Sequence, residues 1–522
     1  MSQNKRSRET VCIQGGWQPK SGEPRVLPIY QSTTFKYDDS DKMGRLFDLE
    51  DEGYFYTRLA NPTNDAVASK ICELEGGVAA MLTSSGQAAS FFSILNICGE
   101  GDHVISSAAI YGGTTNLFTV TLKKLGIDST LVDPDATEEE LEKAFKPNTK
   151  AVFGETIANP ALVVLDIEKF ARAAHRHGVP LIIDNTFATP INCRPFEWGA
   201  DIVTHSTTKY MDGHATCVGG CIVDSGNFDW EANAEKFPGL TTPDESYHGI
   251  VYTQKFGKMA YIMKATAQLM RDLGSIQSPM NAFLLNLGLE TLHLRVPRHC
   301  ENALRVAEYL KSRDDVEWVN YPGLKGDKYY ELAQKYMPDG TCGVISFGLK
   351  GGRDAAVTFM DRLKLAAIGP GTAKALAGHG LRADYIPEVY DAAHLGAGLP
   401  ARGRVLILRA GEGSPALTEA LKGRNIGYDD VACYRTVYEN PRSDELRAAV
   451  ESGAAGIVTF TSASTVKGFV ASVGEDADFS RMVGACIGAQ TAAEARKHGI
   501  PAAVAREATM DALVELITAL RD

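Results

Sequence analysis

The chain has 522 residues, enough for about three domains, and its charged and apolar fractions of 23% and 44% are those of an ordinary globular protein. Its 53 basic and 65 acidic residues give a net charge of −12, which argues against nucleic acid or an anionic membrane as a partner. No apolar run reaches membrane length, and the first residues lack the apolar segment of a signal peptide. Ten scattered cysteines, with only Cys217 and Cys221 close together, predict reduced thiols rather than a metal site. We therefore expect a cytoplasmic protein without a bound metal.

Residues 1–60 predict a loop-rich N-terminal arm. Tyr56 and Arg58 lie near its end, just before a helix predicted over residues 65–74, whose start is marked by Asn61-Pro-Thr-Asn. Both side chains are typical of a surface loop, or of an arm that reaches a phosphate, for which a guanidinium is well suited.

A strand, a turn of small residues and a helix are predicted in succession from residue 79. The backbone amides of Gly86 and Gln87 open this helix, and a helix N-terminus is a natural seat for a phosphate. The next strand ends near Tyr111, whose ring is either a core aromatic or a ring stacked on a planar cofactor. A further strand ends at Glu155, close to Asn159.

Two short apolar strands then bring polar side chains to one edge of the predicted sheet. The first ends in Asp184, and the second leads to Ser206, Thr208 and Lys209. An acid can keep a pyridine nitrogen protonated, a lysine can form a Schiff base, and hydroxyls can bind a phosphate. Each element alone is also typical of a turn or a helix cap. Their combination predicts a site for pyridoxal phosphate.

Strands and helices alternate up to about residue 225, which predicts an α/β fold with a mostly parallel sheet flanked by helices. Residues from about 10 to 368 resemble the cystathionine γ-synthase family of pyridoxal-phosphate enzymes, of fold type I. The resemblance is carried by motifs that occur in the family's order: Tyr56-Thr-Arg58, Ser85-Gly86-Gln87, Tyr111-Gly-Gly-Thr, Asn159-Pro, Asp184-Asn-Thr and Ser206-Thr-Thr208-Lys209.

This resemblance implies a role for each motif. Lys209 would carry the cofactor as a Schiff base and later move protons, Asp184 would pair with the pyridinium nitrogen, and Tyr111 would stack on the ring. The phosphate would be bound by residues of two subunits: Gly86, Gln87, Ser206 and Thr208 of one, and Tyr56 and Arg58 of its neighbour. Asn159 would lie near the ring hydroxyl or the substrate carboxylate. The arrangement implies a homodimer or a homotetramer.

Within the family, residues 237–252 and 288–295 resemble the O-acetylhomoserine sulfhydrylases. The methionine γ-lyases are also similar, but they carry a cysteine where Gly113 stands here. The implied reaction is γ-replacement on O-acetyl-L-homoserine by sulfide, giving L-homocysteine and acetate, as in methionine biosynthesis. A cystathionine γ-synthase or γ-lyase remains an alternative.

The family pattern breaks after Ile368, where the arginine that members use on the substrate carboxylate is expected and is not found. The sequence thus predicts an arm (1–60), a large cofactor-binding domain (61–260), a truncated small domain (261–368) and a further module (369–522). Arg382, Arg402 and Arg409 are the arginines weighed as replacements, and we expect none of them to serve.

The last module contains an internal repeat. The sequence that starts at Ile368 matches the one that starts at Ile487, and each copy predicts a strand end, a loop and a helix. Residues 368–522 resemble uroporphyrinogen-III synthase, a bilobed α/β enzyme that cyclises hydroxymethylbilane in tetrapyrrole biosynthesis, without its opening segment. The resemblance suggests Tyr434 as proton donor or ring-orienting group, and it places three hydroxyls on the substrate's carboxylates: Ser462, Ser464 and Thr491. Helix caps or strand-end hydrogen bonds explain these hydroxyls equally well.

Three hypotheses follow. The first is a pyridoxal-phosphate sulfhydrylase fused to a partial uroporphyrinogen-III synthase-like module. The second is a tetrapyrrole-forming lyase with an inactive N-terminal half. The third is a protein that binds the coenzyme without catalysis.

Overall fold

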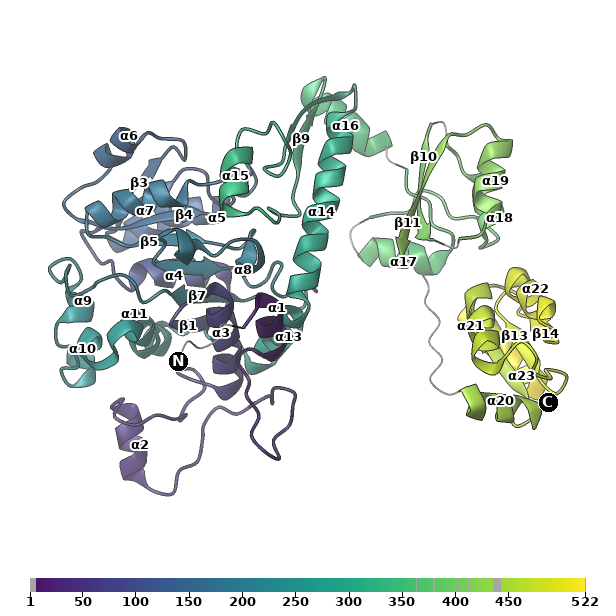
Figure 1. The fold of residues 1–522 in the computed structure, drawn as a ribbon, viewed down its shortest axis with the longest axis horizontal. Coiled ribbons are helices and arrows are strands. Elements are labelled where there is room, and N and C mark those ends of the chain that lie inside the picture. Colours follow the sequence, from purple (N-terminus) through teal and green to yellow (C-terminus); the bar gives the residue numbers. More distant parts are fainter. Residues whose placement is uncertain are drawn as a thin grey trace. The chain divides into compact units, whose positions relative to one another are not determined.

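The computed structural model describes residues 6–521 except 363, 379–380, 402, 412 and 435–442. The chain forms two compact units, residues 1–356 and 357–522 (Figure 1). Among the described residues, no helix is both long and apolar enough to cross a membrane.

A seven-stranded sheet forms the centre of the first unit. Its strands are, in spatial order, β1 (Ala79–Thr83), β7 (Gly220–Asp224), β6 (Ile202–His205), β5 (Leu181–Asp184), β4 (Thr149–Glu155), β2 (His103–Ser107) and β3 (Asp128–Val132). β7 is antiparallel to both of its neighbours, whereas the strands from β6 to β3 are parallel. The sheet is therefore mixed and mostly parallel, as predicted. Glu155 lies opposite Asp184 in the register of β4 and β5, so both acids reach the same edge.

Several helices of this unit pack against the strands of the sheet, and the unit has further helices outside this layer (Figure 1). The helices of the unit are α1 (Arg8–Gln14), α2 (Ser40–Phe47), α3 (Pro62–Glu75), α4 (Gly86–Leu95), α5 (Gly112–Asn116), α6 (Glu138–Lys143), α7 (Ile167–Arg176), α8 (Thr189–Asn192), α9 (Pro238–Thr241), α10 (Tyr252–Phe256), α11 (Ala260–Lys264), α12 (Arg271–Leu273), α13 (Pro279–Glu290), α14 (Leu292–Lys311), α15 (Tyr330–Tyr336) and α16 (Gly352–Arg362), the last of which crosses the division between the units. Those that pack against the sheet include α3, α4, α7 and α11.

Local sequence explains where α3 and α4 begin. The Asn61 side chain accepts a hydrogen bond from the Thr63 amide at 3.0 Å, and Pro62 occupies the first turn, where its missing N–H is not needed. Ser85 caps α4 through the Ala88 amide at 3.1 Å. Both helices start where the sequence predicts, within three residues.

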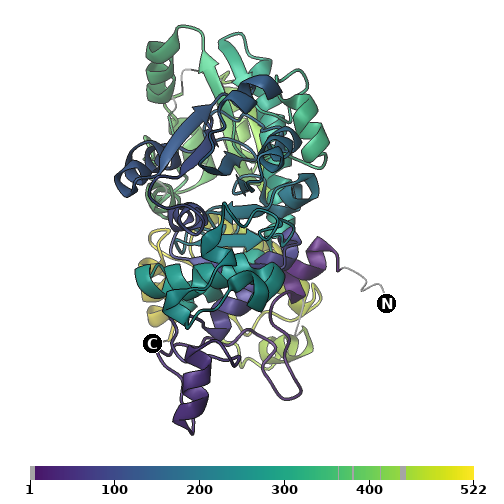
Figure 2. The same cartoon turned by 90° about the vertical axis from the view of Figure 1, so that its left-hand side faces the viewer.

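The arm before α3 departs from the body of its unit. Figure 1 and Figure 2 both show α2 standing away from the sheet and its covering helices. Further along the chain, the strands β8 (Val316–Asn320) and β9 (Ser346–Leu349) form a separate two-stranded antiparallel sheet.

The second unit contains two small parallel sheets. One pairs β10 (Val405–Ala410) with β11 (Tyr428–Tyr434), and the other orders β12 (Ile457–Phe460), β13 (Val483–Cys486) and β14 (Ala502–Val504). The helices of this unit after α16 are α17 (Pro370–Gly378), α18 (Ala392–Gly398), α19 (Ala416–Gly423), α20 (Ser443–Glu451), α21 (Ala463–Val473), α22 (Ala489–Lys497) and α23 (Met510–Arg521). Each sheet has its own small apolar cluster.

The two copies of the internal repeat fold differently. In the second copy, β13 runs through a short loop into α22, as predicted. In the first copy α17 forms, but the residues before it make only an isolated bridge between Ala366 and Tyr385, so the predicted strand is absent there. A single bridge gives this segment no ladder of hydrogen bonds to hold it as a strand.

Candidate active site

Asp184 is fixed at the end of β5 by a turn built from its own neighbours. Its Oδ1 accepts hydrogen bonds from the Thr186 hydroxyl at 2.5 Å and from the Thr186 amide at 3.0 Å. The same hydroxyl oxygen accepts the Ser206 amide at 2.8 Å, which ties the end of β5 to the end of β6. Burial raises the pKa of Asp184, while the Thr186 hydrogen bonds and nearby His205 act in the opposite direction.

Lys209 follows β6 in a tight turn, in which its amide donates to the Ser206 carbonyl at 3.2 Å. Its side chain is exposed, and its amino group has no hydrogen bond or ion pair among the described residues. The turn therefore presents an accessible primary amine at the same edge of the sheet as Asp184.

The N-terminus of α4 packs directly against this turn. A methyl group added to Gly86 would lie 2.5 Å from Ser206 Cβ and 2.8 Å from its Cα, so only glycine permits this approach. Thr208 is held from the other side, because its hydroxyl accepts the Gly219 amide at 3.0 Å. The amides that open α4 and the hydroxyls that follow β6 thus come from elements in direct contact, an arrangement suited to a phosphate.

Glu155 organises the other half of the site. This buried carboxyl, 6% exposed, accepts the Tyr111 amide at 2.6 Å on one oxygen and the Asn159 amide at 3.2 Å on the other. Burial, followed by the charge of Asp184, raises the pKa of Glu155 to about 8. A protonated Glu155 leaves the negative charge of this edge to Asp184. The sequence placed Glu155 at a strand end but gave it no role.

Tyr111 and Gln87 lie on facing elements. The Tyr111 ring is 49% exposed, as a ring that stacks on a ligand must be, and Gln87 donates to the Thr114 hydroxyl at 2.9 Å on the helix that Tyr111 precedes. A methyl group on Gly113 would lie 2.6 Å from the Tyr111 ring, so a larger residue there would displace the ring.

A buried polar network lies next to the residues that flank Asp184, and the sequence analysis does not predict it. Glu75 Oε1, at the end of α3, accepts Asn185 Nδ2 at 2.9 Å and lies 2.7 Å from His205 Nε2. The Thr156 hydroxyl donates to Asn185 Oδ1 at 2.8 Å. The network joins α3 to the ends of β4, β5 and β6. The only feature of the sequence that could have indicated this network is that Asn185 follows Asp184 and His205 precedes Ser206.

Tyr56 and Arg58 lie apart from these residues in their own environment. The Arg58 guanidinium lies 5.1 Å from the centre of the exposed Tyr56 ring, and no contact joins either side chain to the turn at Lys209. Within one chain, the structure therefore does not bring them to the other predicted site residues.

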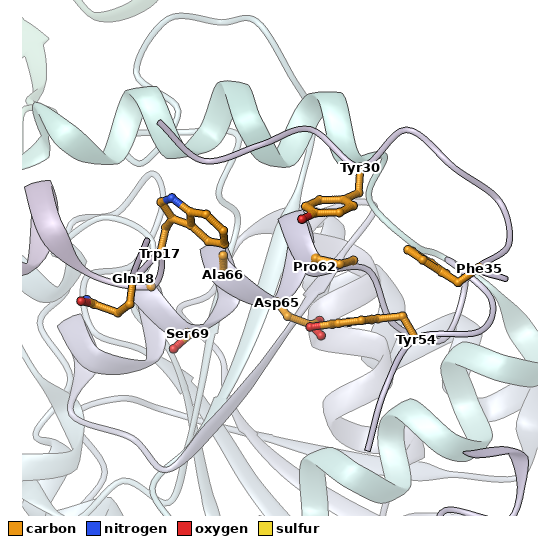
Figure 3. Close-up of a pocket in the computed structure, with 10 residues that line it drawn as sticks. Trp17, Gln18, Tyr30, Phe35, Tyr54, Pro62, Asp65, Ala66 and Ser69 are labelled. Carbon is orange, nitrogen blue, oxygen red and sulfur yellow. The ribbon is translucent and has the colours of Figure 1, made fainter. Parts of the chain in front are cut away.

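A further cavity is also separate from that turn. It measures about 580 Å³ and lies between the N-terminal arm and α3, where Tyr54 and Asp65 point toward one another and Tyr30 and Phe35 also line the cavity (Figure 3). None of the predicted site residues lines it.

In the second unit, Ser462 and Ser464 lie together, with their hydroxyl oxygens 2.8 Å apart. Ser462 also accepts the Thr465 amide at 3.2 Å as the cap of α21, the structural role that its position suggested. Thr491 is buried in α22. The side chain of Tyr434, at the end of β11, lies outside the described residues, as does Arg402. Arg409 is paired with Asp430 at 2.6 Å.

The residues at the sheet edge fit pyridoxal phosphate. Asp184 is oriented by two hydrogen bonds, the Lys209 amine is accessible, and Gly86 allows the close backbone approach that a phosphate seat needs.

Comparisons with known proteins agree with this geometry. Residues 9–386 match the model of the family described as Cys/Met metabolism PLP-dependent enzyme, and residues 346–515 match that of uroporphyrinogen-III synthase HemD. A homocysteine/cysteine synthase of Kluyveromyces lactis is 47% identical over 63% of this chain and 74% of its own length. An O-acetyl-L-homoserine sulfhydrylase of Leptospira meyeri is 44% identical over 71% of this chain and 86% of its own.

Among solved structures, an O-acetylhomoserine (thiol)-lyase of Campylobacter jejuni superposes with a TM-score of 0.67 at 36% identity, over 69% of this chain and 90% of its own. That structure contains a lysine linked to pyridoxal phosphate. The family model covers well over half of the 522 residues. The chain therefore belongs to the Cys/Met metabolism family of pyridoxal-phosphate-dependent enzymes, and a HemD-like region follows its enzyme fold.

Proposed function

We propose that the chain catalyses γ-replacement on O-acetyl-L-homoserine by sulfide, forming L-homocysteine and acetate. The C–O bond at Cγ breaks, a C–S bond forms there, and acetate carries away the bonding electron pair. The observation that carries the proposal is that an oriented Asp184 and an accessible, unpaired Lys209 amine lie at the same sheet edge. The choice of substrate is supported by relatives that are named homocysteine synthase or O-acetyl-L-homoserine sulfhydrylase.

Each reacting group has a candidate partner in the chain. Pyridoxal phosphate, when bound, supplies an electron sink for carbanions at Cα and Cβ of the substrate. Asp184, held by Thr186, keeps the pyridine nitrogen protonated. Lys209 attaches the cofactor and then moves protons at Cα and Cβ, for which its exposed, unpaired amine is suited. Tyr111 stacks on the ring from the loop that Glu155 holds.

The phosphate site is assigned to groups from facing elements. The amides of Gly86 and Gln87 would donate from the start of α4, and the Ser206 hydroxyl would donate from the turn after β6. The Thr208 hydroxyl, which donates to the Gly219 carbonyl at 3.2 Å in this structure, would turn its proton to the phosphate. Asn159 is assigned to the ring hydroxyl or the substrate carboxylate, next to its anchor Glu155.

Tyr56 and Arg58 are assigned to the phosphate of a second copy. They lie on the arm between α2 and α3, where the Tyr56 ring is exposed and Arg58 is half-buried beside it, and this suits a contribution to a neighbouring site. The active protein would then be a homodimer or a larger homo-oligomer.

The visible absorption spectrum of the purified protein tests this proposal. A cofactor band that requires Lys209, shifts when O-acetylhomoserine is added and is followed by sulfide-dependent homocysteine formation is the expected result. If the cofactor band does not shift when O-acetylhomoserine is added, the protein binds the coenzyme but the sulfhydrylase assignment is wrong. Cystathionine formed with cysteine as nucleophile, or 2-oxobutyrate formed without one, would favour the γ-synthase or the γ-lyase.

The HemD-like match over residues 346–515 supports a second candidate, cyclisation of hydroxymethylbilane. This activity would not use the cofactor, so it should survive Lys209→Ala unchanged. If neither the wild type nor Lys209→Ala forms uroporphyrinogen III, the cyclisation activity is ruled out, and the proposed γ-replacement is unaffected.

A further inference from the structure

A small cavity lies at the opposite edge of the central sheet from Lys209. It measures about 220 Å³ and is bounded by the residues that precede β2, the start of β4, the end of α4, and α9 with α11. Asp102 comes just before β2 and Lys150 is the second residue of β4, whereas Asp184 and Ser206 follow the carboxyl ends of their strands. The cavity is therefore distinct from the cofactor site.

Three lysines line this cavity against one carboxylate. Lys150, Lys236 and Lys264 all face it, and its only acidic lining residue is Asp102. Lys150 lies 3.7 Å from Asp102, which also accepts the Gly99 amide at 2.8 Å. Within the part of the chain that the structure describes, no acidic group lies within 4.0 Å of the Lys236 or Lys264 amine. With all three lysines protonated, the described lining residues thus carry an excess of two positive charges.

Lys264 is the most buried of the three, with 7% of its surface exposed. Its amine donates to the carbonyl of Asn96 at 2.8 Å, and so meets the negative end of α4. Burial lowers the pKa of Lys264 to about 8. A helix terminus compensates only about half a charge, and the charge of Asp244 also favours the ammonium form, although Asp244 forms no ion pair with it. The ammonium group therefore has no direct counter-ion among the described residues.

The other two amines bond only to neutral carbonyl groups besides Asp102. Lys150 donates to the Lys236 carbonyl, and Lys236 donates weakly to the Thr149 carbonyl at 3.5 Å. Burial and the charge of Lys150 lower the pKa of Lys236. Buried or crowded cations without an anion are costly, and a polar cavity beside them leaves room for one.

We propose that this cavity, lined by Lys150, Lys236 and Lys264, is a binding site for a tetrahedral oxyanion, either free phosphate or sulfate or the phosphoryl group of a small ester. Three ammonium groups that converge from different elements match a dianion better than a carboxylate. The volume of about 220 Å³ is smaller than the 300 Å³ at which ligand pockets for larger organic molecules begin, so a nucleotide is excluded.

Calorimetric titration of inorganic phosphate into the cofactor-loaded protein tests this site at constant ionic strength. Lys236→Gln should weaken phosphate binding about tenfold, as expected for the loss of one charged hydrogen bond. The matched control is Lys255→Gln, which removes an exposed lysine that does not line the cavity and should leave the affinity unchanged. The visible cofactor band should not fall during the titration, which separates this site from the cofactor's own phosphate seat.

A second variant supplies the missing anion from the protein. A methyl group on Gly239 would lie 3.2 Å from Lys264 Cε and 3.7 Å from its amine, so Gly239→Asp places a carboxylate in the cavity. This variant should melt at a higher temperature without phosphate and should lose the phosphate response. Tighter binding of glycerol phosphate than of inorganic phosphate would identify an ester as the ligand and also support the site. Equal binding by wild type and Lys236→Gln, or no binding, would overturn it.

Discussion

Glu155 is the residue whose protonation should govern how stability depends on pH. Its pKa is raised from 4.5 to about 8 in the folded chain, so between these pH values the folded state keeps a proton that the unfolded state releases. Stability is therefore highest below the lower value and declines as pH rises toward 8. We expect Glu155→Gln to lose less stability than wild type between pH 5.5 and 8.5, measured by urea unfolding of the cofactor-free protein.

The matched control for that measurement is Glu139→Gln, which alters an exposed carboxylate. It should keep the wild-type dependence on pH. A wild-type slope in Glu155→Gln would show that the buried carboxyl is ionised throughout.

Thr186 should matter for cofactor affinity rather than for the fold. Its hydroxyl orients Asp184 and accepts the Ser206 amide, so Thr186→Val removes two hydrogen bonds while keeping the side-chain shape. The loss should cost about 1–3 kcal/mol of pyridoxal-phosphate binding, measured as the dissociation constant by absorption. Thr186→Ser retains the hydroxyl and should retain the affinity. Equal affinities in both variants would contradict the role.

At this scale, local sequence predicted the residues that meet at one sheet edge and missed those that support them. Asp184, Ser206 and Lys209 stand out because they follow apolar strands. Glu75 contacts His205 across 130 residues, and no pattern of period two or 3.6 records such a contact. Tyr111 was predicted as a ring for stacking, but its dependence on Glu155 comes from a backbone amide, which carries no sequence signal.

At the scale of elements, the start of α4 and the turn after β6 are in close contact at Gly86. Gly86→Ala would force the Ser206 backbone and side chain to move, because the added methyl group would lie only 2.5 Å from Ser206 Cβ. We expect a loss of about 1–3 kcal/mol in stability together with weaker cofactor binding, measured by urea unfolding and by absorption. Gly44→Ala in α2, where the added methyl group meets nothing within 4 Å, is the control and should not destabilise.

Strand β10 shows an unusual exposure for a parallel strand. Leu406 and Leu408 are 61% and 64% exposed, whereas Ile407 between them is 6% exposed and packs in the apolar cluster with α18 and α19. Parallel sheets are normally covered on both faces, so this face should promote aggregation. We expect Leu406→Lys with Leu408→Lys to raise solubility without lowering the melting temperature. Ile407→Lys should unfold the sheet of β10 and β11. If the Leu406→Lys/Leu408→Lys variant also has a lowered melting temperature, the outer face of β10 is covered by protein.

Several elements of the first unit could be predicted from the sequence, because apolar runs and capping residues mark their ends. The start of α3 follows from Asn61 and Pro62, and the end of β5 from Asp184. The strand expected before α17 could not be judged locally, because a strand needs a partner that only the fold supplies.

At the scale of the whole molecule, no linker composition marks the change from one family pattern to the other. The two family models overlap over residues 346–386, and the division into compact units falls inside α16, at 356/357. Because a helix continues across the division between the units, loop or turn residues in the sequence cannot mark its position.

The proposed exchange of arms between copies gives a test at the same scale. Arg58→Ala should remove the phosphate contact that a chain offers its neighbour, and Lys209→Ala should remove the amine of its own site. Each variant alone should be nearly inactive. When they are unfolded and refolded together, half of the dimers formed at random are mixed, and each mixed dimer has one intact site.

The mixture should therefore recover about a quarter of the wild-type activity, measured as homocysteine formation per subunit. A matched control mixes Lys209→Ala with Asp184→Ala. Because one chain supplies both of these residues to a given site, no intact site can form in a mixed dimer. Recovery in this control would mean that Asp184 and Lys209 act from different chains. No recovery in the first mixture, with oligomers present, would place Arg58 in the site of its own chain and remove the requirement for a second copy.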